Sequence, residues 1–306
     1  MKKLSLIAIL SSFLFSCGGG GGGENITISG KVVASNVKGL KVCIKNSDTC
    51  TLTDKNGNFY LESPAPFPAL NFYVDNILLA DYTLKENGEI ITPFKMAEGN
   101  ETVGDILSKI IHAFGGDVNG TEPVIDLSNI SDVSINGQSI DPTNSIEDYL
   151  RSGETVKIEF YSDGKTYTVE CYPSNSTVEL CEDSNCTSVN YRQWLVLIYM
   201  DGDNSLGSTR DNSYVFSDLS EMESVSFPPQ IKVVALVDYY GDTGGEIYET
   251  DGTGKLKKVA NTNELNMGDP ETLVNFVKEY MDKFPSPKNA LIFWDHNKLS
   301  NKVFSN

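Results

Sequence analysis

Polar side chains with the capacity for acid–base chemistry follow three apolar runs in the second half of the chain. They are Asp201, Asp203 and Asn204 after residues 195–199, Asp238 after residues 233–237, and Asp295 with His296 after residues 290–294. A histidine near carboxylates suits a general base, because the unperturbed pKa of imidazole lies near neutral pH. The alternative is a histidine with a structural role. This set of residues is therefore a candidate catalytic site.

The apolar runs also predict the elements that position these residues. Each run is continuous, which is typical of a strand buried on both faces of a sheet. Residues 215–222 and 273–284 have apolar positions at helical spacing, and Asp269-Pro270 favours a helix start. Residues 246–259 predict a hairpin. Alternating strands and helices predict a parallel sheet covered by helices, and sites in such sheets form beyond the carboxyl ends of the strands.

Four segments of this region also resemble the clostripain family of cysteine peptidases. They are Trp194 to Asn204 (WLVLIYMDGDN), Asp218 to Glu223 (DLSEME), Asn266 to Leu273 (NMGDPETL) and Leu291 to His296 (LIFWDH), in this order. The resemblance implies a caspase-like α/β/α fold. It also implies that His296, which matches the histidine of the family's Trp-x-His motif, is the general base of a Cys–His dyad. Members of the family cleave after Arg or Lys, and an acidic specificity pocket explains that preference by charge pairing.

The sequence departs from the family pattern after His296. Asn297 follows where the family has glycine, and residues 297–306 match no part of the pattern. The family's nucleophilic cysteine lies on the next strand, whereas this sequence has no cysteine after Cys186. A frameshift or a premature stop just after His296 would account for both departures.

These observations favour a truncated clostripain-like cysteine endopeptidase that is inactive alone, because a base without a thiolate lacks the covalent route to peptide cleavage. Its parent would act on peptide or protein substrates. The alternative is a non-catalytic surface lipoprotein that serves in binding or adhesion.

The loop that contains Asp201, Asp203 and Asn204 has a second interpretation as a calcium site, because calcium prefers oxygen ligands. No glutamate stands at the twelfth loop position, so the loop is not an EF-hand. The alternative is a solvated cluster of carboxylates at the end of the sheet. The sequence has no Cys-x-x-Cys pair and gives no indication of a zinc site. Calcium is thus the one metal that the sequence suggests.

The N-terminus predicts export and lipid anchoring. A short basic start precedes an apolar run over residues 4–15, which is too short to span a bilayer and typical of a signal peptide. Residues 14–17 (LFSC) resemble the lipobox of bacterial lipoproteins, which implies cleavage before Cys17 and acylation of that residue. The six glycines at 18–23 predict a flexible tether.

We therefore expect a signal peptide over residues 1–16, then a lipidated cysteine and tether over residues 17–24. The protein would be anchored to the bacterial cell envelope, at the outer membrane or the cell surface, with the membrane as a partner. The alternative is an ordinary secretory leader with an incidental cysteine.

Residues 25–100 predict a β-sandwich, because short strands alternate with turns such as Asn56-Gly57. The segments 29–33 and 53–59 also resemble the carboxypeptidase-regulatory-like modules of bacterial surface proteins. That resemblance implies a spacer or an adhesion unit.

Residues 101–190 predict an α+β middle region, with one helix over 101–114 followed by strands. His112 borders the apolar face of that helix, where a histidine is usually a packed or solvated side chain rather than a ligand. Residues 191–306 complete a multidomain chain as an incomplete α/β/α parallel sheet.

Export implies an oxidising compartment, in which disulfides are the default. Cys43 and Cys50 flank a predicted tight turn and are expected to pair. Cys171 and Cys181 are expected to face each other across a hairpin. Cys186 completes an odd set of five after the lipobox cysteine, so at least one thiol has no partner within the chain.

Length and charge bound the class of protein. The 306 residues, 40% of them hydrophobic, provide roughly two domains with their own cores. The formal net charge of −18 argues against nucleic acid as a partner, since phosphates repel an acidic surface.

Overall fold

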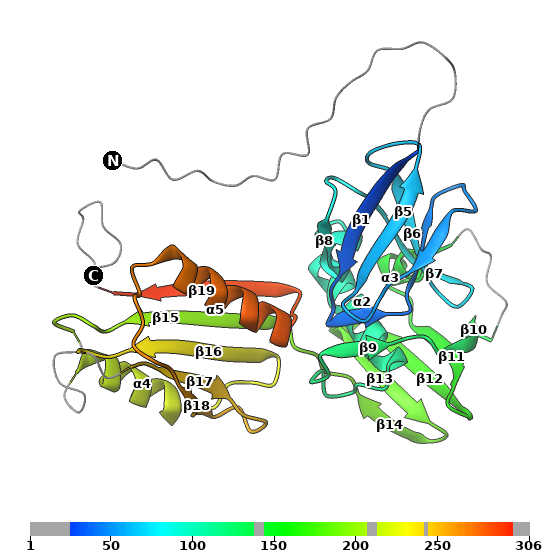
Figure 1. Cartoon of the computed structure of the whole chain (residues 1–306). Helices are drawn as coiled ribbons and strands as arrows, with labels where there is room; N and C mark the ends of the chain where they lie inside the picture. Colours follow the sequence, from blue (N-terminus) through cyan, green and yellow to red (C-terminus); the bar gives the residue numbers. More distant parts are fainter. Residues whose placement is uncertain (1–24, 138–143, 207–212, 242–243, 296–306) are drawn as a thin grey trace, which may run out of the picture.

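The computed structural model describes residues 25–137, 144–206, 213–241 and 244–295. Helices and strands in this part of the chain form two bodies (Figure 1). We call residues 25–189 the N-terminal body and residues 190–295 the C-terminal body. The predicted signal peptide, Cys17, the tether and His296 lie outside the described residues. In the described ranges, no helix has the length and apolar character needed to span a membrane.

The N-terminal body is rich in short strands. Its strands are β1 (Ile26–Val32), β2 (Asn36–Lys38), β3 (Lys41–Ile44), β4 (Cys50–Leu52), β5 (Asn58–Ser63), β6 (Ala69–Val74), β7 (Ile77–Thr83), β8 (Glu89–Ile91), β9 (Val124–Asp126), β10 (Ser131–Ile135), β11 (Val156–Ser162), β12 (Lys165–Tyr172), β13 (Thr177–Glu182) and β14 (Asn185–Ser188). Its helices are α1 (Pro93–Met96), α2 (Glu101–Phe114) and α3 (Ile146–Ser152), with a 3-10 turn at Pro173–Asn175. The sheet orders are β5-β1-β8, β4-β3-β6-β7, β2-β9 and β10-β11-β12-β13-β14.

Helix α2 forms where the sequence predicts a helix and lies at the centre of this body. Asn100 caps its start, because the Asn100 side chain accepts a hydrogen bond from the Val103 backbone N–H at 3.1 Å. Its apolar residues are buried, as periodic spacing requires, and each such Leu or Ile side chain contributes roughly 1.5–3 kcal/mol. The helix therefore acts as core for the strands around it.

One hydrophobic core runs through the whole N-terminal body. It includes Ile28 and Phe72 from the first hundred residues, and Ile110, Ile158 and Val178 from the next ninety. Strand β2 also pairs in parallel with β9, across the boundary that the sequence predicts near residue 100. Residues 25–100 and 101–190 thus share a core, because the apolar face of α2 is buried by strands from both sides of that boundary.

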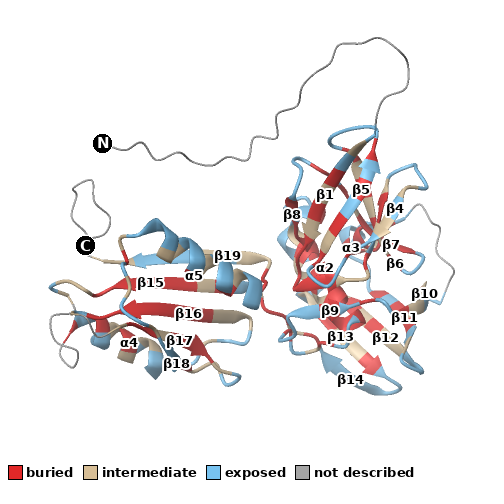
Figure 2. Cartoon of the chain, in the orientation of Figure 1, coloured by how far each residue is buried: buried red, intermediate tan, exposed pale blue. Residues whose placement is uncertain are grey.

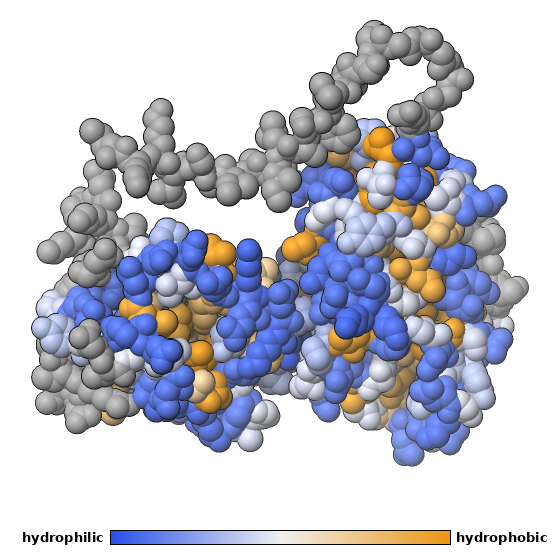
Figure 3. Space-filling model, viewed as in Figure 1, coloured by the Kyte–Doolittle hydropathy of each residue, from blue (hydrophilic) through white to orange (hydrophobic). Residues whose placement is uncertain are grey.

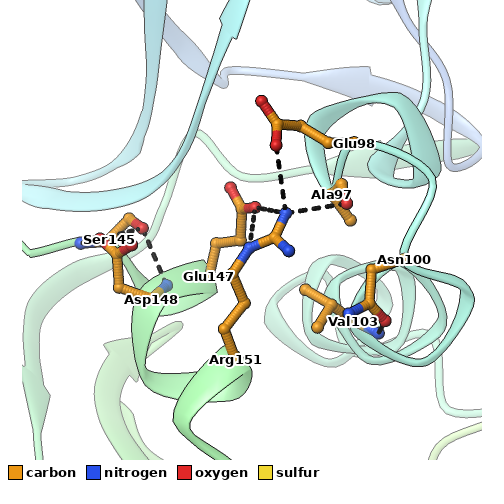
Figure 4. A network of polar contacts seen from close by, with 8 residues as sticks. All are labelled: Ala97, Glu98, Asn100, Val103, Ser145, Glu147, Asp148 and Arg151. Carbon is orange, nitrogen blue, oxygen red and sulfur yellow. Dashed lines mark hydrogen bonds and ion pairs between the residues drawn. The ribbon is translucent and has the colours of Figure 1, made fainter.

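A polar network adds to this shared core. Arg151 on α3 donates to the Ala97 backbone carbonyl at 2.8 Å and pairs with Glu147, one helical turn earlier (Figure 4). Ser145 and Asp148 close a capping box at the start of α3. The network ties α3 to the segment between α1 and α2.

The disulfides follow the register of the strands. Cys43 and Cys50 are opposed on β3 and β4 and form a disulfide, the pairing that the sequence predicts. The expected pairing of Cys171 with Cys181 is wrong. In the register of β12 and β13, Cys171 opposes Val178, whereas Cys181 opposes Cys186 on β14 and bonds to it. Cys171 remains a free thiol in the core.

The C-terminal body is a five-stranded sheet with a helix on each face. The elements are β15 (Trp194–Asp201), α4 (Tyr214–Ser224), β16 (Ile231–Asp238), β17 (Glu246–Thr250), β18 (Leu256–Asn261), α5 (Pro270–Lys283) and β19 (Lys288–Trp294). Strand order is β18-β17-β16-β15-β19, with β15, β16 and β19 parallel. The predicted hairpin is β17 and β18, which add two antiparallel strands and make the sheet mixed.

Alternation along β15 explains the two helical layers. Ile198 and Met200 pack with α4, whereas Leu197 and Tyr199 pack with α5 on the opposite face. Strand β19 is covered less than β15 and β16 (Figure 2). Its Ile292 is 46% exposed, and β19 is one of the two edge strands of the described sheet.

The two bodies meet at the amino ends of β15 and β16 (Figure 1). Asp105 on α2 accepts hydrogen bonds from the Tyr191 hydroxyl at 3.1 Å and the Gln193 side chain at 2.8 Å. Lys288 at the start of β19 pairs with Glu101. The carboxyl ends of the parallel strands therefore point away from the N-terminal body.

Candidate functional site

The parallel register brings the predicted polar residues to one edge of the C-terminal sheet. Asp201 opposes Asp238, and Met200 opposes Trp294, so that Asp295 emerges beside Asp201. We call this end of the sheet, with the loops that leave it, the carboxyl edge. His296, the predicted base, follows Asp295 directly but lies outside the described residues.

Two carboxylates at this edge are buried. Asp201 is 1% exposed, and neither of its carboxylate oxygens has a hydrogen-bond partner among the described residues. Asp238 is fully buried. Its Oδ1 accepts from the Tyr239 backbone N–H at 3.1 Å, whereas Oδ2 has no partner in the described ranges. Unpaired buried carboxylates of this kind are costly to ionise.

The environment of these two groups favours their neutral forms. Burial, and then the Asp295 charge, raise the pKa of Asp201 to about 6. The nearby Asp203 amide opposes this increase only in part. Burial, followed by Glu264 and Asp203, raises the pKa of Asp238 to about 7. Both groups can therefore exchange protons near neutral pH, which is a property of many functional sites.

Asn204 and Asp203 connect the loops of the carboxyl edge. The Asn204 side-chain amide donates to the Asp201 backbone carbonyl at 3.0 Å and to Asp295 Oδ1 at 3.2 Å. Asp203 Oδ1 accepts from the Gly241 backbone N–H at 2.9 Å, beyond the end of β16. These two side chains fix the loop after β15 against the chain ends on both sides of it.

Two further contacts at this edge have weak signals in the sequence. Trp294 donates its indole N–H to Asp218 on α4 at 2.7 Å, which anchors the end of β19. A partly buried indole needs an acceptor, but sequence spacing does not say which one. A Cβ at Gly202 would lie 2.5 Å from the Asp238 carbonyl oxygen, so only glycine allows this close approach.

Two oxygens at the start of the loop after β15 already accept hydrogen bonds. Asp203 Oδ1 is held by the Gly241 N–H, and Asn204 Oδ1 accepts from the Leu206 N–H at 2.8 Å. In the part of the chain that the structure describes, no three His, Cys, Asp or Glu side chains are placed to hold a metal ion. The calcium interpretation of this loop stays a prediction.

Other polar candidates lie far from this edge. His112 is fully buried in the N-terminal body, where Nδ1 contacts Asp117 Oδ2 at 2.9 Å and Nε2 contacts the Ala34 carbonyl at 3.3 Å. Burial raises the pKa of the Cys171 thiol to about 12, so it stays protonated and unreactive at neutral pH. Within the described ranges, the other four cysteines form disulfides.

Comparison with known proteins identifies relatives of the C-terminal body. Residues 198–302 match the model of the clostripain family. A B. fragilis cysteine protease of known structure is similar over 35% of this chain and 91% of its own, with 20% identity and a TM-score of 0.30. A secreted C11 cysteine protease from Bacteroides thetaiotaomicron, in complex with an irreversible peptide inhibitor, has 17% identity and a TM-score of 0.30.

That second alignment covers 35% of this chain and 30% of the protease, so this chain spans less than a third of that relative. No curated protein matches the chain. The matched segment begins in β15 and includes β16, β19 and both helices, so it concerns the C-terminal body only.

Proposed function

We propose that the C-terminal body is part of a clostripain-like cysteine endopeptidase domain, carried by an exported protein with a lipid anchor at Cys17. The observation that carries the proposal is the match of residues 198–302 to the clostripain family, in a region where three parallel strands end together. His296 would be the general base of a Cys–His dyad in this domain. It would take the thiol proton and later return a proton to the leaving amine.

The electrostatics of the carboxyl edge support a basic peptide as substrate. Asp201, Asp203, Asp238, Glu264 and Asp295 all contribute negative charge there when ionised. A peptide with Arg or Lys at the cleavage position would be attracted to such an edge. Nucleic acid would be repelled, in agreement with the net charge of −18.

We expect no hydrolysis of Arg- or Lys-containing fluorogenic peptides by the 306-residue chain alone. The sequence has no cysteine after Cys186, and Cys186 is bonded to Cys181 on the far side of the N-terminal body. A base without a thiolate lacks the covalent step. Cleavage that is lost both in His296→Ala and after thiol alkylation would contradict this expectation. Cleavage that His296→Ala leaves unchanged would indicate a contaminating peptidase.

The sequence of the gene beyond the codon for Asn306 tests the family assignment separately. A reading frame that encodes His-Gly and then Asp-Ala-Cys would supply the missing nucleophile. A locus with no such frame would favour the second candidate function, a non-catalytic surface binding lipoprotein. The N-terminal body has a hydrophobic core separate from the two cores of the C-terminal body, as an independent binding module would need, and this supports the second candidate.

The lipid anchor is tested by phase partitioning. We expect the wild-type protein to enter the detergent phase and Cys17→Ser to remain in the aqueous phase, because several acyl chains anchor a protein stably. Ser16→Ala is the matched control and should still partition with detergent, since it preserves the cysteine. A wild-type protein in the aqueous phase with its N-terminal peptide intact would rule out the lipobox.

A further inference from the structure

A cavity of about 290 Å3 lies at the junction of the two bodies, at the opposite end of the sheet from the carboxyl edge. Gly120 and Thr121 of the N-terminal body line one side, and Arg192 lies between the bodies. Residues 227–229, 231–232 and 250–254 of the C-terminal body complete the lining. The volume is close to the lower end of the range for small-molecule sites.

The walls of this junction cavity are held by close backbone contacts. A Cβ at Gly120 would lie 1.9 Å from the Tyr191 Cα, so glycine is required where the two bodies touch. Gly254 has a φ of +77°, and a Cβ there would lie 2.0 Å from the Phe227 carbonyl oxygen. The Phe227 N–H also donates to the Gly254 carbonyl at 2.8 Å. The cavity is therefore built into the fold.

Arg192 is the unusual residue of the lining. It is 7% exposed, and its Nη1 has no hydrogen-bond partner among the described residues. Nη2 makes a long contact of 3.5 Å to the Thr121 carbonyl, and the guanidinium carbon lies 5.2 Å from the Phe284 ring centre. No carboxylate forms an ion pair with Arg192 in the described ranges, in a chain with a net charge of −18.

Burial lowers the pKa of Arg192, and the charge of Asp117 opposes that decrease. An arginine nonetheless remains charged at neutral pH. A buried cation with an unused donor is costly to the folded protein unless an anion joins it. An anion that entered the cavity would lie beside the guanidinium group and offset its charge.

The other polar groups of the lining are already engaged. Lys232 Nζ donates to Glu249 at 3.1 Å and to the Thr250 carbonyl at 2.6 Å. The Asp251 carboxylate accepts from the Thr253 and Lys255 backbone amides. Among the described lining residues, Arg192 therefore provides the charge without an ion-pair partner, because Lys232 pairs with Glu249 and Asp251 pairs with Lys257.

The rest of the lining is apolar. Phe227, Pro228, Pro229 and Ile231 contribute a hydrophobic wall next to the guanidinium. A planar guanidinium matches a carboxylate in shape and charge. We propose that the junction cavity binds a small organic monocarboxylate, which accepts hydrogen bonds from Arg192 and packs its apolar part against Phe227 and Pro228. Such a ligand would contact both bodies at once. The proposal is independent of the peptidase assignment.

Isothermal titration calorimetry on the full chain tests the ligand class with butyrate, its neutral analogue butyramide, and inorganic phosphate. We expect butyrate to bind at least tenfold more tightly than either of the other two. Equal binding of butyrate and butyramide, or no binding of butyrate, would overturn the proposal. Tighter binding of phosphate would replace the monocarboxylate with a dianion and would also overturn it.

Two variants test the place of binding. Arg192→Met should weaken butyrate binding at least tenfold, whereas Arg151→Met, which removes an arginine of the N-terminal body, should leave it unchanged. Gly252 lines the cavity and has open space around it, so Gly252→Leu should block binding without a backbone change. This second variant decides the matter if Arg192→Met does not fold. Binding that survives Gly252→Leu and a folded Arg192→Met would place the site elsewhere.

Discussion

The N-terminal body and the carboxyl edge of the C-terminal body differ in whether their buried charged groups have partners. In the N-terminal body, His112 faces Asp117, and Glu147 pairs with Arg151, so each buried charged group has a partner. At the carboxyl edge of the C-terminal body, Asp201 and the Oδ2 atom of Asp238 have no partners among the described residues. Both bodies show a largely hydrophilic outer face with scattered apolar patches (Figure 3), so the contrast lies in the interior.

This difference separates buried charges whose desolvation is offset by a partner from buried charges that lower the stability of the folded protein. A paired buried charge contributes to the folded state, and removal of one partner leaves the other unsatisfied. An unpaired buried carboxylate opposes folding at neutral pH, so its presence indicates a role other than stability. On physical grounds alone, the carboxyl edge is therefore the place where we expect chemistry.

The largest expected effect concerns Asp117, which contacts His112 in the core of the N-terminal body. Burial disfavours the charged form of Asp117, but hydrogen bonds from His112, Thr121 and Glu122 overcome this and lower the pKa of Asp117. Asp117→Ala should reduce the free energy of unfolding by about 3–5 kcal/mol, since His112 loses its partner in the core. Urea unfolding at pH 7 measures this. A loss below about 1 kcal/mol would remove the distinction between the two bodies.

Asp201→Asn and Asp238→Asn should increase the free energy of unfolding, and by less than Asp117→Ala decreases it. Each folded-state pKa, about 6 and about 7, is raised above the ordinary value of 3.8, so the folded protein holds protons that the unfolded chain releases. Stability is thus lost as pH rises from about 4 through 7, and the loss is complete above that range. At about 1.36 kcal/mol per pKa unit, these differences set upper limits of roughly 3 and 4 kcal/mol at pH 8. Each variant should gain on the order of 2 kcal/mol, because the buried Asn side chain would itself lack hydrogen-bond partners.

That gain should disappear near pH 4.5, where the wild-type carboxyls are protonated in the folded state. Asp282→Asn is the matched control, because Asp282 is an exposed carboxylate on α5. Denaturant unfolding at the two pH values gives the comparison. A gain that does not depend on pH would mean that lost packing strain, not charge, is responsible.

The smallest expected effect concerns the support of the segment that precedes His296. Asn204→Ala removes the hydrogen bond to Asp295 Oδ1, which should cost about 1 kcal/mol in total stability. The larger consequence should be local, with faster amide hydrogen exchange at Trp294 and Asp295. Asn289→Ala, near the amino end of β19, is the control and should leave amide hydrogen exchange at Trp294 and Asp295 unchanged. Equal rates in all three proteins would show that the Asp218–Trp294 contact alone holds the strand.

The local patterns of the sequence predict much of this structure. The periodic apolar positions of 101–114 give α2, and the three continuous runs give β15, β16 and β19. The pairing of Cys43 with Cys50 also follows from local chemistry, because a tight turn brings them together. Local signals succeed at these places since the residues that decide the structure are close in the sequence.

Local patterns do not predict which residues pair when these lie far apart in the sequence. In the register of β12 and β13, Cys171 opposes Val178, three residues before Cys181, so that Cys181 pairs with Cys186 instead. Nothing in the residues of that hairpin predicts this register. The shared core across residue 100 likewise depends on α2 being buried by strands from both halves. Side-chain burial in three dimensions determines both features.

By itself the sequence determined which residues reach the carboxyl edge, because parallel strands bring their ends together wherever Asp201, Asp238 and Asp295 follow them. Only the tertiary structure decided which of these carboxylates are buried without partners, and that Asn204 joins the loop after β15 to Asp295. It alone also placed Arg192 in a cavity between the two bodies. The physical reason is that desolvation and hydrogen bonding depend on neighbours from distant parts of the chain, whereas strand and helix formation depends largely on neighbours in sequence.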